Sequence, residues 1–314
     1  MGIIIFVTII FLILKIKPKR LRLSDYFIAL SVTTLLSMNI IELSEMSSIT
    51  YSKGDTTMPR ITVADPLTYI ESWSLFPIIM IFGIEYKTLP SFLGFIRPRN
   101  IVGLSSFILI LSCVIIGLLS IVSEREILII RSVFNIIFFT SVVTFSLSVY
   151  ALGGFDNSEI VHLIQGEKKA RYILTVLHVK ISFILLLLGI FIAALFSIPY
   201  GEDRETYRFA LYYLAIHTIA IGFIGITISL YLSIGKTVLF TSLNKIPLVL
   251  IVLSLGLRAF GDIILAQGSS VPNFIYLYSS FPILKILNLL LGLSGWLVLA
   301  AIVLFVITLH RSMK

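Results

Sequence analysis

The feature that most constrains this sequence is a succession of apolar runs, each long enough to cross a lipid bilayer as one helix. A spanning helix needs about 20 mainly apolar residues, or somewhat fewer when flanking side chains reach the interface. We therefore predict an all-α, polytopic integral membrane bundle of nine transmembrane helices. The runs lie at 2–16, 26–45, 69–86, 101–122, 127–152, 173–199, 209–235, 246–266 and 289–309.

The composition excludes most other classes of protein. The chain is 58% hydrophobic and only 13% charged, with a mean hydropathy of +1.07, whereas an ordinary soluble domain is about 25% charged. Such a chain is neither a soluble enzyme nor disordered. Cys113 is its one cysteine, so a disulfide scaffold is also excluded. No soluble domain is expected, and residues 1–314 are interpreted as a single transmembrane domain.

The loop charges predict the orientation of the chain. The first run has no basic segment before it and is followed by KIKPKRLR, which indicates a retained helix whose amino end lies outside the cell. Alternation from there places fifteen Lys and Arg residues in cytoplasmic segments and six in outer loops. This asymmetry predicts a multi-pass protein of the cell membrane with a cytoplasmic carboxy terminus. The net charge of +8 then reflects topology, and no nucleic acid partner is expected.

One segment does not fit the pattern of spans. Residues 273–288 are aromatic and are bracketed by Pro272 and Pro282. A proline at each end and an aromatic composition are more typical of an interfacial helix than of a tenth span.

Ionisable residues inside the predicted spans are candidates for a functional site, because charge at bilayer depth is costly unless it is paired or solvated. Two interpretations remain open. One is a buried network in which Arg131 or Arg258 pairs with an acidic side chain and holds the helices together. The other is a cofactor pocket in which these arginines face an anionic group. Six such residues fall in the outer half of the spans: Glu42, Glu71, Arg131, His217, Arg258 and Asp262.

Histidine is the natural metal ligand in this chain, and His178 and His217 lie on consecutive predicted helices. The pair suggests a clamp on one haem iron. Counted from the intervening loop, however, the two residues differ in depth by roughly 16 Å, so one iron is not expected to reach both. His217 is the stronger candidate ligand. No catalytic triad, phosphate loop or cysteine pair occurs, so no hydrolytic chemistry is expected.

The stretch 172–309 resembles the carboxy-terminal half of the NnrS family of haem- and copper-containing membrane proteins. The similarity lies in LAIHTIAIGFIG, with His217, Gly222 and Phe223, and in the pair Leu257 and Arg258. It implies that His217 binds a haem b and that Arg258 lies near this cofactor. The histidine-rich amino-terminal half of the family has no counterpart, so copper and a binuclear centre are not expected.

The composition is also similar to that of the very hydrophobic membrane component of the archaeal cytochrome b558/566. This resemblance implies a respiratory electron-transfer or anchoring chain in contact with membrane lipid and with a second, extracytoplasmic haem-bearing cytochrome subunit. Quinone is a further partner that stays open.

Two alternatives to a cytochrome subunit remain. The segment IEYKTLPSFLGFIRPRN, which includes Glu85 and Arg99, is similar to the coupling-helix region of ABC-2 type exporter permeases. That resemblance implies a transporter permease working with a separate ATPase. The third interpretation is a membrane scaffold without a cofactor.

Overall fold

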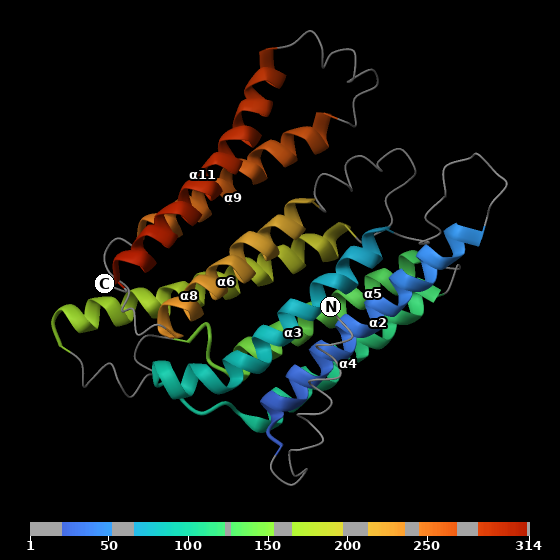
Figure 1. Cartoon of the computed structure of the whole chain (residues 1–314), viewed down its shortest axis with the longest axis horizontal. Coiled ribbons are helices and arrows are strands. Elements are labelled where there is room, and N and C mark those ends of the chain that lie inside the picture. Colours follow the sequence, from blue (N-terminus) through green and yellow to red (C-terminus); the bar gives the residue numbers. More distant parts are fainter. Residues whose placement is uncertain are drawn as a thin grey trace. The chain divides into compact units, whose positions relative to one another are not determined.

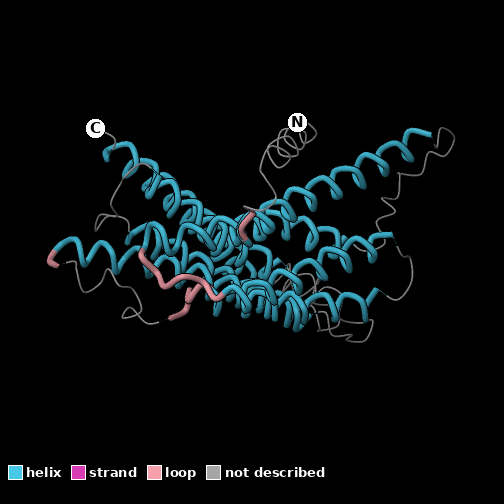
Figure 2. The backbone as a smooth tube through the Cα atoms, turned by 90° about the horizontal axis from the view of Figure 1, so that it is seen from below, coloured by secondary structure: helices cyan, strands magenta, loops and turns pink. Residues whose placement is uncertain are grey.

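The computed structural model describes residues 21–51, 66–122, 127–153, 165–196, 213–235, 245–268 and 282–312. Within these ranges the chain consists of helices and connecting loops, and no strand is present (Figure 2). The first predicted helix, 2–16, and most of the basic segment that follows it lie outside the described residues, as do residues 273–281.

The helices follow the predicted apolar runs. Seven of those described are long and apolar enough to cross a membrane, and α5 contributes a shorter apolar segment, Ser132–Ser148. The chain is therefore all-helical where it is described and has the character of a multi-pass membrane protein, while nine spans and their orientation stay predictions. The helices are α2 (Leu23–Tyr51), α3 (Pro66–Leu93), α4 (Asn100–Val122), α5 (Ile127–Ser148), α6 (Glu167–Phe196), the π-helix η4 (Thr218–Gly225), α8 (Ile226–Gly235), α9 (Lys245–Gly268) and α11 (Pro282–Ser312), as labelled in Figure 1.

Two helix boundaries differ from the sequence-based expectation. Helix α11 begins at Pro282, so residues 282–288 form its first two turns, while the candidate span within it begins at Asn288. Proline suits this position because the first helical N–H has no partner within the helix. Helix α3 continues to Leu93, past the expected end at 86, and stops at Gly94, whose φ of 64° allows the left-handed cap.

The chain divides into two compact units, the first made of Met1–Pro90 and Arg97–Val149 and the second of Ser91–Ile96 and Tyr150–Lys314. Aromatic rings form the core of the first unit. Phe82 and Phe145 stack with ring centroids 3.8 Å apart, and Phe27 meets both rings edge-on. Helices α4 and α5 are joined by Ser106 and Ser141, each of which donates a hydrogen bond to the other's backbone carbonyl, at 2.9 and 3.0 Å. Such polar contacts between small residues stabilise helix pairs in membranes.

The second unit places η4 against α6 and α9. Gly222 lies at their meeting point, where an added Cβ would come within 2.8 Å of Leu185 Cδ1 and 3.2 Å of Leu255 Cδ1. Only glycine permits this close approach without movement of the neighbours. Helices α9 and α11 run side by side (Figure 1) and are joined by the Ser254 hydroxyl, which donates to the Ser294 carbonyl at 2.7 Å.

Candidate functional site

A charged pair lies in the second half of α9, inside the candidate span Lys245–Ile264. Arg258 and Asp262 are one helical turn apart, and the Arg258 Nε donates to the Asp262 Oδ2 at 3.0 Å. The Asp262 side chain is 5% exposed and that of Arg258 is 26% exposed. The two Nη groups of Arg258 are not used in this pair. Because charge at bilayer depth is costly, such a pair indicates either an ion pair that stabilises the helix bundle or a binding site.

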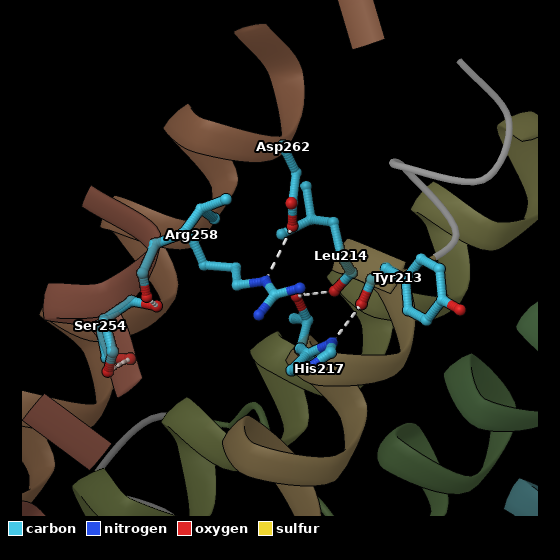
Figure 3. A network of polar contacts seen from close by, with 9 residues as sticks. Tyr213, Leu214, His217, Ser254, Arg258 and Asp262 are labelled. Atoms are coloured by element: carbon cyan, nitrogen blue, oxygen red, sulfur yellow. Dashed lines mark hydrogen bonds and ion pairs between the residues drawn. The ribbon is translucent and has the colours of Figure 1, made fainter. Parts of the chain in front are cut away.

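His217 faces this pair from the neighbouring helix. Figure 3 shows Arg258 and Asp262 reaching from α9 toward the turn that carries His217, and Asp262 interacts electrostatically with the imidazole. The Nδ1 of His217 lies 2.6 Å from the Tyr213 carbonyl oxygen. Since a carbonyl only accepts hydrogen bonds, Nδ1 is the donor in this contact, and Nε2 is the ring nitrogen left for a ligand. Histidines that bind metals have this arrangement, because the second nitrogen fixes the tautomer and the ring orientation.

The structure thus brings together three of the six residues singled out from the sequence. His217, Arg258 and Asp262 form one polar cluster, and Arg258 with Asp262 is one of the pairings that the ion-pair interpretation allowed. The side chains of Glu42, Glu71 and Arg131 lie outside the described residues.

His178 occupies a different level of the second unit. It is buried on α6, and its Nδ1 lies 2.7 Å from the Leu174 carbonyl oxygen. Further along the same helix, Gly189 packs against Ile219 and the Ala215 carbonyl, so His217 lies level with residue 189. The two histidines are therefore separated by about eleven residues of α6, or roughly 17 Å. One haem iron cannot bind both.

A cavity of about 410 Å³ lies beside His178, and nothing in the sequence pattern indicated it. Its walls come from α6, η4, α8, α9 and α11, and His178 is the only ionisable residue among the described residues that line it. Small residues at the wall, including Ala220, Gly225 and Ala301, leave the space open. These small residues lie on different helices and are far apart in the sequence, so only the packing of the helices shows that they line one space.

Glu85 is a second feature that the sequence interpretation did not single out. The predicted run 69–86 places it at the end of a span, whereas it lies well inside the candidate span Leu75–Leu93 and is completely buried. Neither carboxylate oxygen has a hydrogen-bond partner among the described residues. The continuation of α3 to Leu93 explains the difference, because it moves Glu85 away from the end of the helix.

The polar cluster offers two kinds of contact that would suit an anionic, metal-bearing cofactor. The Nε2 lone pair of His217 suits an axial position on a metal, and the Nη groups of Arg258 suit a carboxylate. No group of three or more His, Cys, Asp or Glu side chains that could hold a bare metal ion occurs in the described part of the chain. A haem iron, by contrast, takes as few as one protein ligand.

Comparison with known proteins adds no relative to this picture. The chain matches no protein-family model, no curated protein and no solved structure.

Proposed function

We propose that this chain is a membrane component of a respiratory cytochrome complex and that it binds a haem b through His217. The observation that carries the proposal is the position of His217, whose Nδ1 lies 2.6 Å from the Tyr213 carbonyl oxygen, so that Nε2 is the nitrogen left to bind a metal. This imidazole lies beside the Arg258–Asp262 pair within a membrane-spanning helix. The resemblance of residues 172–309 to the NnrS family rests on the sequence motifs quoted above and is matched by no family model, and it implies the same assignment.

Each residue of the cluster has a distinct role in the proposal. His217 would hold the haem iron through Nε2, and the hydrogen bond to Tyr213 fixes the plane of its ring. Arg258 offers its Nη groups to a haem propionate, because its Nε is already bound to Asp262. Asp262 orients the guanidinium and balances its charge within the membrane. The haem, when bound, supplies a one-electron redox centre whose potential depends on the axial ligand and on the surrounding charges.

The position of the cluster in the predicted topology suggests its partner. With the amino terminus outside, the second half of α9 lies in the outer half of the cell membrane. A haem at this depth suits electron exchange with a second, extracytoplasmic haem-bearing subunit. The chain then anchors that subunit and carries electrons to or from it.

The permease alternative has no comparable support in the fold. Residues 84–99 are described in full and contain the last turns of α3 followed by a non-helical connection up to α4. No separate coupling helix occurs within this segment.

Replacement of His217 tests the proposal. The chain with His217→Ala is purified beside a control with His310→Ala, since His310 is an exposed histidine near the end of α11. We expect the haem content to fall to background in the first variant and to stay unchanged in the second. An unaltered haem content and visible spectrum in His217→Ala would overturn the ligand assignment.

A further inference from the structure

Glu85 on α3 is an acidic residue in the interior of the first unit, whereas the proposed haem site belongs to the second. The residue is 0% exposed, and neither carboxylate oxygen has a hydrogen-bond partner among the described residues. Ile81, Phe82 and Leu89 lie one turn away on the same face of α3, and all three are buried and apolar. Glu85 is therefore a titratable group on a buried stripe that is otherwise apolar.

Burial without a partner determines which form of the carboxyl is present. An ionised carboxylate without a counter-charge costs far more free energy in an apolar interior than a neutral polar group does, so such a group takes up a proton instead. Asp262 is the opposite case, because its side chain is 5% exposed but accepts a hydrogen bond from the Arg258 Nε at 3.0 Å, which allows it to stay ionised. Among the described residues, the two buried acids thus differ in the contact that decides their charge.

Glu85 lies near the end of the first unit at which two neighbouring helices begin. A Cβ on Gly83 would come within 2.9 Å of the Ser24 carbonyl oxygen in the first turn of α2. The Tyr86 hydroxyl donates to the Oδ1 of Asn100, an exposed residue at the start of α4, at 2.9 Å. Glu85 is therefore level with these first turns, roughly 5 Å or one turn along the axis from exposed residues. In the predicted topology this is the cytoplasmic end.

The cations described at this end do not neutralise the carboxyl. Arg22, Lys87, Arg97 and Arg99 are all exposed, whereas Glu85 is buried, and none of them donates a hydrogen bond to it. A bound metal cation is also disfavoured, because it takes several ligands and no group of three or more His, Cys, Asp or Glu side chains suited to a metal occurs in the described ranges. A proton is the ligand that fits a single carboxyl.

We propose that Glu85 is a proton-binding site, which holds a proton in the interior of the first unit and exchanges it with water at the end where α2 and α4 begin. The site gives the chain a group that takes up and releases protons within a membrane-spanning helix. This inference goes beyond the proposed haem function and does not rest on it.

Infrared spectroscopy of the purified full chain tests the protonation, in a maltoside detergent that has no carbonyl group of its own. The carbonyl stretch of a neutral carboxylic acid lies at higher wavenumber than either band of a carboxylate. We expect one such band to be lost in Glu85→Gln, the neutral isostere, and to persist in Asp262→Asn, which removes the buried acid that is paired with Arg258. A folded Glu85→Gln chain that shows no such loss would mean that the carboxyl is ionised, and it would overturn the proposal.

The same band tests the exchange with water. We expect transfer of the unaltered chain into D₂O to shift the band to lower wavenumber, because deuterium replaces the acidic proton. A band that keeps its position after the exposed amides have exchanged would refute an exchanging site.

A lipophilic carbodiimide tests the site without any substitution. Dicyclohexylcarbodiimide reacts with the neutral acid: the acidic proton moves to a carbodiimide nitrogen, a carboxyl oxygen bonds to the central carbon, and rearrangement to the N-acylurea releases no atoms. Peptide mass spectrometry of the unaltered chain should find this adduct on Glu85 and little or none on Asp262, whose carboxylate is paired. Equal modification of the two residues, or an unmodified Glu85, would contradict the proposal.

Discussion

Arg258→Leu, which removes the guanidinium, should destabilise the second unit much more than Asp262→Asn, which removes the charge of its partner. Arg258→Leu leaves the Asp262 carboxylate, which is 5% exposed, without its ion-pair partner at 3.0 Å. Breaking a fully buried pair from one side costs about 3–5 kcal/mol. Arg258 is 26% exposed, so the pair is partly screened, and we expect a loss of about 2–3 kcal/mol.

Removal of the Asp262 charge leaves the Arg258 guanidinium unpaired, which costs less free energy than an unpaired Asp262 carboxylate. In Asp262→Asn the guanidinium remains, and its long, partly exposed side chain can turn toward a more polar level of the membrane. We expect this variant to lose about 1 kcal/mol. The double variant Arg258→Leu with Asp262→Leu removes both charges, and it should lie within about 1 kcal/mol of the unaltered chain.

Reversible unfolding in mixed detergent and SDS micelles measures these differences in the free energy of unfolding. Lys245→Leu serves as the control, because Lys245 is an exposed cation at the start of the same helix and should change stability by less than about 0.5 kcal/mol. Equal losses of stability in Asp262→Asn and Arg258→Leu, or a double variant no more stable than Arg258→Leu, would contradict a buried carboxylate that depends on Arg258.

Three further substitutions test the packing by the same unfolding measurement. Gly222→Ala should lower the free energy of unfolding by about 1–3 kcal/mol, because the added Cβ meets side chains of α6 and α9. Gly256→Ala is the control and should cause no loss, since the space around its Cβ is open. Equal effects of the two substitutions would contradict the close approach at Gly222. Ser254→Ala removes the hydrogen bond between α9 and α11 and should lower the free energy of unfolding by about 0.6 kcal/mol. Ser112→Ala removes a hydroxyl that donates to the Ile108 carbonyl of its own helix, and it should leave stability unchanged. Glu85→Met removes a buried carboxyl without a described partner and should leave stability unchanged or raise it by about 1–3 kcal/mol; a marked loss would show that the carboxyl has a partner after all.

The apolar runs predicted the helices well because the bilayer thickness fixes their length. Boundaries were predicted less well where polar residues occur inside a helix. Lys285 and Asn288 interrupt the hydropathy of the first turns of α11, so the hydropathy pattern placed its start at 289 and not at Pro282. Glu85 and Lys87 likewise interrupt the hydropathy near the end of α3, so the hydropathy pattern placed its end at 86 and not at Leu93.

The candidate site was partly predictable for a similar reason. Depth counted along each predicted helix placed His217, Arg258 and Asp262 in the same half of their spans, because each residue of a helix adds a fixed rise along its axis. The hydrogen bond that sets the His217 tautomer depends on a side-chain rotamer, which no sequence pattern specifies. The cavity beside His178 depends on how several helices pack, and the π-helix leaves no mark in hydropathy, so neither was predictable.

A reduced-minus-oxidised visible spectrum, combined with haem quantification on the purified chain alone and with its co-purifying proteins, tests directly whether this chain itself holds a haem. We expect stoichiometric b-type haem on the isolated chain. Haem confined to a partner protein would contradict it and indicate an anchoring role, and a haem-free chain that co-purifies with an ATPase would indicate the transporter.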